Sequence, residues 1–310
     1  MTTSIPEEQI LKELEAASIR MARGAGAVLQ GFHPGRTHVE YKGKESTDPV
    51  TEADFKVEEY LRGEISREFP DHGVVGEEST DAGTDNADFM WAVDPLDGTA
   101  NFAAGMPLYA VSIGLLYKGI PVVGSLFLPS TFAGNGVYHA RVGGGAFVDG
   151  EPLRVVPGPL PQPSGLAGFP ASYGRAFSFK REKGKGLGEM RIMGSIAGEM
   201  VLVASGKFQY SLFIGSHIWD VAAGVVLVRE AGGEVLEWRK EKWRPLGDFV
   251  VTPQKAGEGR SQALRRWGVP LLVGAPDIVT YLASRTRVRR RRLGSIMHRI
   301  KAIWARKKRG

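Results

Sequence analysis

The chain has 310 residues, with 43% hydrophobic and 24% charged residues, which is ordinary for a globular protein of one large domain or two sub-domains. It contains no cysteine, which excludes disulfides, zinc–thiolate sites and a cysteine nucleophile. The net charge of +6 is unevenly distributed: residues 285–310 carry 12 of the 40 Lys and Arg and no acidic residue, which leaves 28 basic against 34 acidic residues before them. The body of the protein is therefore acidic, and the high isoelectric point gives no evidence that it binds nucleic acid.

Two helices are predicted in the first part of the chain. Apolar residues at helical spacing indicate the first helix from Glu8 to Leu29, although Gly24 and Gly26 weaken its second half. A polar connection follows over residues 33–46, and the second helix runs from Thr51 to Phe69. The N-terminus lacks the pattern of a secretory signal, and no apolar run approaches the ~20 residues that span a bilayer, so a cytoplasmic location is expected.

The pattern then changes to strands and finally to an alternation of helices and strands. The predicted strands of the first group are Gly73–Gly76, Phe89–Val93, Tyr109–Tyr117, Val122–Leu128, Gly136–Arg141 and Ala146–Val148. After the Pro-rich segment 157–163 we expect helices at Ser195–Ala204 and Trp219–Ala231, and strands at Gln209–Ile214 and Glu234–Glu237. This alternation is typical of an α/β fold. The expected division is an N-terminal α+β sub-domain (1–156), a C-terminal α/β sub-domain (157–284) and a basic tail (285–310).

The segment Trp91–Phe102 carries the clearest chemical signal. An apolar run delivers two carboxylates, Asp94 and Asp97, into a turn that Pro95 stiffens. Two oxygen ligands on a rigid turn suit a hard cation such as Mg²⁺. A helix can begin at Gly98-Thr99, where free N–H groups would suit a phosphate. Taken alone, the segment is equally explained by an Asx-type turn with a structural role.

Three further segments accompany this turn: residues 48–54, which end at Asp54, Gly76-Glu77-Glu78-Ser79, and Trp219-Asp220-Val221-Ala222. Together with Asp94-Pro95-Leu96-Asp97-Gly98-Thr99, they resemble the inositol monophosphatase family. That family is part of a superfamily of metal-dependent phosphomonoesterases that includes fructose-1,6-bisphosphatase-like and nucleotide-phosphate phosphatases. The resemblance covers roughly residues 10–280, and it implies a layered α/β/α/β/α sandwich.

The resemblance also implies a role for each motif residue. One metal would be held by Glu77, Asp94 and the carbonyl of Leu96, and a second by Asp94, Asp97 and Asp220, with Asp94 as the bridge. The catalytic residues would be Asp54 and Thr99, which position and deprotonate the attacking water, together with Glu77. The substrate would contact Asp97, Gly98, Thr99, Ile196, Phe213 and Asp220. Because the ligands are all oxygen atoms, Mg²⁺ is expected as the cofactor, with Mn²⁺ as a substitute.

Two positions depart from the pattern of inositol-specific members. Those members carry a glutamate seven residues before the aspartate of Trp-Asp, where this chain has Phe213, and a small residue where this chain has Ile196. Both changes replace a polyol contact with apolar bulk, and a site without its polar partners loses discrimination. We therefore expect a phosphatase for a small phosphomonoester: an inositol phosphate, a sugar phosphate such as fructose 1,6-bisphosphate, or a nucleotide 3′-phosphate.

A catalytically inactive, membrane-docked scaffold or sensor that keeps the fold is the alternative reading. The intact set of motif carboxylates argues against it, because a decayed site loses a ligand first. The remaining candidate partners are an anionic membrane surface and a second copy of the chain, whereas no specific nucleic acid is expected.

The basic tail has a pattern of its own. Ser295 offers a helix N-cap, and the apolar residues that follow share one arc of a helix: Ile296, Met297, Ile300, Ile303 and Trp304. Such a helix is typical of a peripheral contact with an anionic membrane. A solvated or disordered basic tail explains the same residues, because isolated helices this short are marginal in water.

Overall fold

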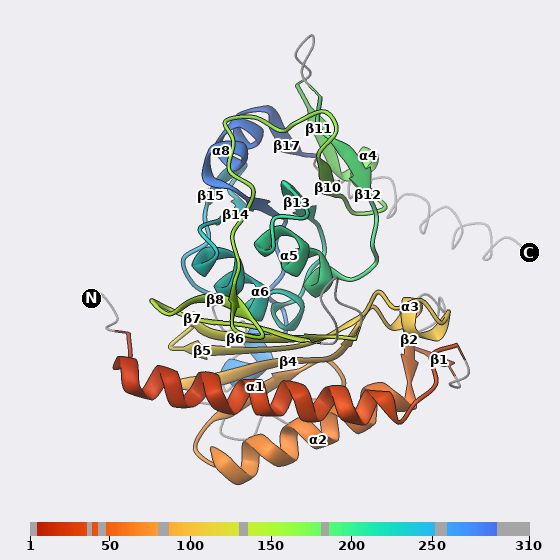
Figure 1. Ribbon diagram of the computed structural model, residues 1–310, viewed down its shortest axis with the longest axis vertical. Helices are drawn as coiled ribbons and strands as arrows, with labels where there is room; N and C mark the ends of the chain where they lie inside the picture. Colours follow the sequence, from red (N-terminus) through yellow and green to blue (C-terminus); the bar gives the residue numbers. More distant parts are fainter. Residues whose placement is uncertain are drawn as a thin grey trace, which may run out of the picture.

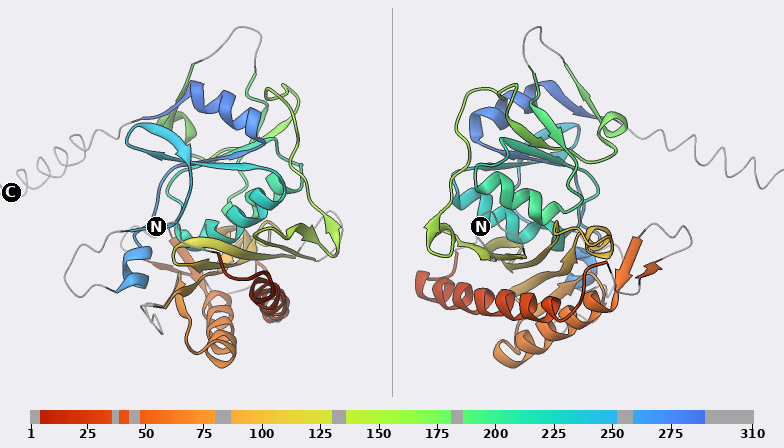
Figure 2. Two further views of the ribbon diagram at one scale, coloured as in Figure 1. Left: turned by 90° about the vertical axis from the view of Figure 1, so that its left-hand side faces the viewer. Right: turned by 45° about the vertical axis from the view of Figure 1, so that its right-hand side comes forward.

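Five layers of helices and sheets make up the fold (Figure 1). The computed structural model describes residues 5–35, 39–42, 48–79, 87–129, 136–180, 186–251 and 259–289. In order, the layers are a helix pair, a seven-stranded sheet, a second helix pair, a six-stranded sheet and an outer helix (Figure 2). The α/β/α/β/α sandwich expected from the sequence is confirmed.

The larger sheet has the strand order β3-β4-β5-β6-β7-β8-β9. Its strands are β3 (Gly73–Gly76), β4 (Phe89–Asp97), β5 (Ala110–Tyr117), β6 (Ile120–Leu128), β7 (Gly136–Arg141), β8 (Gly145–Val148) and β9 (Glu151–Pro152). β3 and β4 are parallel, and the other neighbours are antiparallel. One face is covered by α1 (Glu8–Gln30) and α2 (Glu52–Glu68). β4 continues four residues beyond its predicted end, because Asp97 still pairs with Ala110 of β5 after a register irregularity.

The two glycines in the second half of α1 mark its close contacts. A Cβ atom on Gly24 would lie 1.8 Å from the hydroxyl oxygen of Tyr60, and one on Gly26 would lie 2.6 Å from the ring of Phe127. The missing side chains let α1 approach α2 and β6 closely, and this packing outweighs the low helix propensity of glycine.

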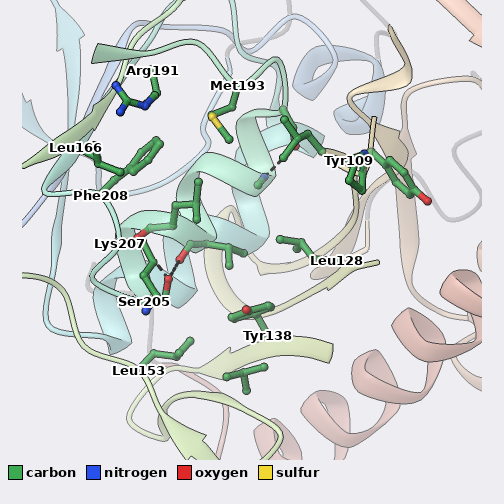
Figure 3. A pocket seen from close by; sticks show the side chains of 17 residues that line it. Tyr109, Leu128, Tyr138, Leu153, Leu166, Arg191, Met193, Ser205, Lys207 and Phe208 are labelled. Carbon is green, nitrogen blue, oxygen red and sulfur yellow. Dashed lines mark hydrogen bonds between the residues drawn. The ribbon is translucent and has the colours of Figure 1, made fainter. Parts of the chain in front are cut away.

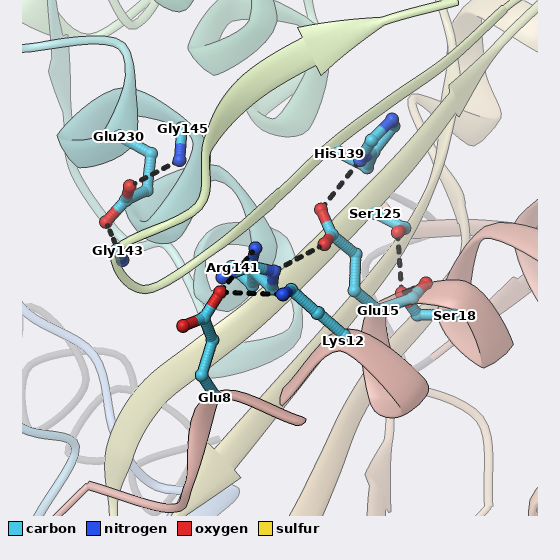
Figure 4. A network of polar contacts seen from close by, with 10 residues as sticks. All are labelled: Glu8, Lys12, Glu15, Ser18, Ser125, His139, Arg141, Gly143, Gly145 and Glu230. Carbon is cyan, nitrogen blue, oxygen red and sulfur yellow. Dashed lines mark hydrogen bonds and ion pairs between the residues drawn. The ribbon is translucent and has the colours of Figure 1, made fainter. Parts of the chain in front are cut away.

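A polar network fixes α1 on the sheet (Figure 4). Glu15 lies 2.8 Å from Nδ1 of His139 and 3.1 Å from Nε of Arg141, both on β7. The hydroxyls of Ser18 and Ser125 are 2.7 Å apart and buried. Because buried polar groups without partners are costly, these pairs specify how α1 sits on the sheet.

The smaller sheet has the order β12-β10-β13-β16-β14-β15. Its strands are β10 (Leu166–Gly168), β12 (Glu189–Arg191), β13 (Tyr210–Phe213), β14 (Glu234–Arg239), β15 (Lys242–Pro245) and β16 (Leu271–Gly274). Between the two sheets lie α5 (Ile196–Ala204) and α6 (Ile218–Glu230), and α8 (Pro276–Arg285) covers the outer face. The apolar core between the sheets includes residues from both sides of segment 157–163, and the expected sub-domain division stays a prediction.

Short elements complete the fold and correct two expectations. They are the pair β1 (Val39–Lys42) and β2 (Asp48–Thr51), the pair β11 (Phe177–Phe179) and β17 (Thr286–Val288), and the helices α3 (Thr99–Ala103), α4 (Tyr173–Ala176) and α7 (Arg260–Leu264). The connection predicted over residues 33–46 therefore contains a strand, β1, and this strand pairs with β2. The start of the basic tail is also a strand, since β17 pairs with β11.

The amphipathic part of the tail, residues 290–310, lies outside the described residues. Among the helices that the structure describes, none is long and apolar enough to cross a membrane.

Candidate active site

Four carboxylates from three separate segments converge at one end of the larger sheet. Asp94 and Asp97 stand at the end of β4, and each is at most 9% exposed. Burial raises the pKa of Asp94 well above its ordinary value, and the carboxylates of Glu77, Asp97 and Asp220 raise it further. Such mutual repulsion occurs only between groups that lie close together. The structure therefore brings together the four acidic residues that were expected to bind metal.

Asp97 is held by the first turn of α5. Its carboxylate accepts hydrogen bonds from Oγ of Ser195 at 2.5 Å, from the backbone N–H of Ala197 at 2.8 Å and from that of Ile196 at 3.2 Å. Burial raises the pKa of Asp97 to about 6, and these hydrogen bonds oppose the rise. Because Ser195 is also the N-cap of α5, one serine orders both the helix start and the carboxylate.

Asp220 comes from the first turn of α6, in the central helix layer. Its Oδ2 accepts the backbone N–H of His217 at 2.7 Å, and the ring of His217 stacks on Trp219 at 4.7 Å. Burial raises the pKa of Asp220 well above its ordinary value, with a further contribution from Asp97. The motif Trp219-Asp220 therefore places an acid against the end of β4 although more than 100 residues separate them.

Asp54 and Thr99 form a pair beside the carboxylate cluster. Oγ1 of Thr99 lies 3.0 Å from Oδ1 of Asp54 and 2.9 Å from the carbonyl oxygen of Leu96. The other oxygen of Asp54 accepts the N–H and the hydroxyl of Thr51, both at 2.7 Å, so the carboxyl cannot turn freely. Burial raises the pKa of Asp54, although these bonds oppose the rise.

Gly98 makes the turn between the metal-ligand motif and α3. Its φ of 94° is left-handed, and a Cβ atom there would lie 2.8 Å from the carbonyl oxygen of Leu108. Only glycine adopts this conformation without strain or collision. The sequence pattern Asp-Gly-Thr is thus explained by backbone geometry, and Gly98 stands directly before the helix predicted at Thr99.

The two predicted substrate contacts in the C-terminal half are placed differently from each other. Ile196 reaches the cluster through its backbone N–H, and its side chain packs at the border of the core between the sheets. Phe213 ends β13 and is 3% exposed within the same core. The role of both as substrate contacts stays a prediction.

Sequence reasoning missed Ser195, which bonds Asp97, and three residues around Glu77: Glu58, Arg62 and Arg265. These three hold the segment that carries Glu77 by hydrogen bonds to its backbone. The i,i+4 spacing of Glu58 and Arg62 on a predicted helix indicated an ion pair. Nothing in the sequence indicated which backbone groups the pair would hydrogen-bond.

The chemistry of the donor set fits a hard divalent cation. Its oxygens come from buried carboxylates, and the pKa values of Asp94 and Asp220 are raised both by burial and by the negative charge of their neighbours. Among the residues that the structure describes, however, no three acidic or histidine side chains are oriented as a finished ligand set. Asp97 and Asp220 accept backbone N–H groups in this structure.

A cavity of about 530 Å³ lies beside the cluster, between α5 and the larger sheet (Figure 3). Its walls are mainly apolar, with Tyr138, Leu202 and Phe208 among them. Ser195, which bonds Asp97, belongs to the wall, but none of the motif carboxylates does. The cavity is therefore adjacent to the acidic site and separate from it.

Comparison with known proteins agrees with this geometry. The chain matches the model of the inositol monophosphatase family over residues 10–266. It is 34% identical over 232 residues to a fructose-1,6-bisphosphatase/inositol-1-monophosphatase of Aquifex aeolicus, which covers 73% of this chain and 86% of the relative. It is 35% identical over 254 residues to an inositol-1-monophosphatase of Synechocystis, which covers 77% and 84% of the two chains.

Solved structures show the same architecture. The extragenic suppressor protein SuhB of Bartonella henselae superposes with a TM-score of 0.69 at 27% identity, over 88% of this chain and 97% of the other. The inositol monophosphatase of Anabaena superposes with a TM-score of 0.66 at 28% identity, over 88% and 95%. With a family match over most of its length and relatives above 30% identity, the chain belongs to the inositol monophosphatase family.

Proposed function

We propose that the protein is a Mg²⁺-dependent phosphatase that hydrolyses a small phosphomonoester, with Mn²⁺ as a substitute metal. The observation that carries the proposal is the cluster of Glu77, Asp94, Asp97 and Asp220, in which burial raises the pKa of the three aspartates and repulsion by neighbouring carboxylates adds to the rise for Asp94 and Asp220. A cluster of this charge is tolerable in a folded protein when cations neutralise it. The family match and the relatives named as phosphatases support the same conclusion.

Each residue has a distinct part in the proposed reaction. Glu77, Asp94 and the carbonyl of Leu96 would hold one ion, and Asp94, Asp97 and Asp220 the other. Bound there, the ions would lower the pKa of a water molecule and stabilise the leaving oxygen.

Asp54 and Thr99 would handle the proton of the attacking water. When the hydroxyl of Thr99 donates to Oδ1 of Asp54, 3.0 Å away, its oxygen can still accept a hydrogen bond from that water. Asp54 then serves as the proton acceptor through Thr99, and its raised pKa brings it closer to the working pH of a general base. The N–H groups of Gly98 and Thr99 would hold phosphate oxygens.

The substrate class follows from the residues around the leaving group. Phe213 and Ile196 stand at the positions where inositol-specific members carry polar contacts, and neither side chain can hydrogen-bond a ring hydroxyl, so we propose that inositol 1-phosphate is not the preferred substrate. The relatives are named for both fructose 1,6-bisphosphate and inositol 1-phosphate. A sugar phosphate, another inositol phosphate or a nucleotide 3′-phosphate remains in the proposed range.

The test is phosphate release from a panel of these phosphomonoesters, with Mg²⁺, with Mn²⁺ and with excess chelator. We expect turnover of at least one substrate, its loss in chelator, and its loss in Asp94→Asn with an unchanged circular dichroism spectrum. Substantial turnover in chelator or by Asp94→Asn would overturn the assignment. A wild type that prefers inositol 1-phosphate over the rest of the panel would overturn the substrate argument alone.

A further inference from the structure

The segment Gly76–Ser79 carries Glu77, and side chains of α2 hydrogen-bond to its backbone. The carboxylate of Glu58 accepts the N–H of Glu78 at 2.7 Å and the N–H of Ser79 at 2.9 Å. Nε of Arg62 donates to the same carboxylate at 2.7 Å. Glu58 is 2% exposed, and these donors compensate the charge of its buried carboxylate. The fit is close, because a Cβ atom on Gly76 would lie 2.6 Å from Oε1 of Glu58.

Arg265 hydrogen-bonds to the carbonyl oxygens of the same segment. This residue caps the C-terminal end of α7, 186 residues after Ser79 in the sequence. Its guanidinium donates to the carbonyl oxygens of Gly76, Ser79 (2.8 Å) and Glu77 (2.9 Å). Three carbonyls on one guanidinium fix the direction in which the backbone presents Glu77, since the planar fork of arginine holds several acceptors at once.

The same guanidinium also contacts the other half of the proposed metal site. Its central carbon lies 5.1 Å from the ring centre of Trp219, the residue before Asp220. Arg265 therefore touches the backbone that carries Glu77 and the side chain next to Asp220. Burial lowers the pKa of Arg265, and the nearby carboxylates of Glu58 and Glu77 oppose this, which keeps it a cation in its position between the two segments.

We infer that Arg265 is a positioning residue that sets the metal affinity of the site by fixing the segment of Glu77 relative to Asp220. The inference rests on the proposed metal site. Residues that orient a metal ligand typically change metal affinity 10–100-fold when they are removed. Simple electrostatics makes the opposite prediction: loss of a positive charge near an acidic cluster would tighten cation binding. The sign of the change therefore distinguishes positioning from charge.

The experiment measures binding of Mn²⁺ alone, from the electron paramagnetic resonance signal of the free ion. The variants are Arg265→Ala, Arg265→Lys and Gly76→Ala. The Cβ atom of the last would collide with Glu58, so it disturbs the contact of α2 with the same segment without a change in charge. Arg266→Ala is the matched control, because it removes an equal charge from the neighbouring, exposed residue. We expect the Mn²⁺ dissociation constant to rise about tenfold or more in Arg265→Ala. The Mn²⁺ dissociation constant of Arg265→Lys should rise less, and that of Arg266→Ala should stay within twofold of the wild-type value.

Turnover provides the second readout. At saturating Mn²⁺, kcat of Arg265→Ala should return to within about threefold of wild type, because an ion once bound restores the position of Glu77. If Arg265→Ala does not fold, Arg265→Lys and Gly76→Ala carry the test, with circular dichroism as the folding control.

Unchanged or tighter Mn²⁺ binding in Arg265→Ala, or a loss of kcat that excess metal does not restore, would overturn the inference. The failure of the proposed function looks different. In that case wild type itself would bind no Mn²⁺, or Asp94→Asn would bind it as well as wild type.

Discussion

The metal-free protein should lose stability as the pH rises through the range in which its site carboxylates ionise. Burial raises the pKa of Asp97 from 3.8 to about 6, and it also raises the pKa of Asp94 and Asp220 well above their ordinary value. A carboxyl with a raised pKa binds its proton more tightly in the folded state than in the unfolded chain. Its contribution to stability is therefore complete below about pH 4 and is lost as the pH rises through the folded-state pKa.

The size of the effect follows from Asp97. A rise in pKa from 3.8 to about 6 corresponds to about 3 kcal/mol, at about 1.4 kcal/mol for each tenfold change in proton affinity. Asp94 and Asp220 act in the same direction. Asp94→Asn removes one charge and keeps the side-chain oxygen that accepts the N–H of Leu96 at 3.0 Å. The variant should therefore be more stable than wild type near neutral pH, by about 1–3 kcal/mol.

The assay is urea unfolding of chelator-treated protein between about pH 4.5 and pH 8, followed by tryptophan fluorescence. We expect the difference in unfolding free energy between wild type and Asp94→Asn to widen as the pH rises. Added Mg²⁺ should stabilise wild type near pH 7 and have little effect on the variant. Asp248→Asn, which changes an exposed carboxylate, is the control and should run parallel to wild type. Parallel curves for wild type and Asp94→Asn across this range would refute the reasoning.

Three further predictions test other parts of the structure. Thr99→Val should lower kcat about 100-fold or more with unchanged Mn²⁺ binding, measured at saturating metal, because it removes the hydroxyl that links the water to its base; near-normal turnover would contradict this role. Gly24→Ala should destabilise the protein by about 1–3 kcal/mol in urea unfolding, since the new Cβ collides with the hydroxyl of Tyr60, and Tyr60→Phe in the same chain should restore part of the loss. Removal of residues 290–310, a cut that spares strand Thr286–Val288, should leave turnover of soluble substrates unchanged and abolish sedimentation with anionic vesicles at low salt; equal sedimentation of both proteins would exclude the membrane role.

Local pattern was sufficient for the longer elements of the first half of the chain, whereas β10, β12, β15 and β16 of the smaller sheet and the outer helix α8 were not predicted. The first helix was predicted over Glu8–Leu29 and runs over Glu8–Gln30, and the strands at Gly73–Gly76 and Gly136–Arg141 have the predicted bounds. These elements depend on the spacing of apolar residues within a short window, which is visible in the sequence itself. The same holds for the helix start expected at Gly98-Thr99, whereas the left-handed conformation of Gly98 was seen only in the structure.

The site motifs were also readable in advance, but their surroundings were not. The acidic residues stood out because motif and residue type are local properties, and the structure brings Glu77, Asp94, Asp97 and Asp220 together. The hydrogen bond from Ser195 to Asp97 joins residues 98 positions apart, and the one from Arg265 to Glu77 joins residues 188 apart. Neither partner carries a signal in its own neighbourhood.

By itself, then, the sequence predicted the residues to which the chemistry is assigned, and the resemblance carried by its motifs implied the order of the layers. Tertiary structure decided which groups hold those residues in place: Glu58 and Arg265 on the segment of Glu77, and the first turn of α5 on Asp97. It also decided that Thr286–Val288 is a strand of the fold and not part of the tail, because its pairing partner lies more than 100 residues earlier. The periodicity of apolar residues shows which face of a segment is buried. A contact between distant segments depends instead on how the layers pack, and no short stretch of sequence contains that information.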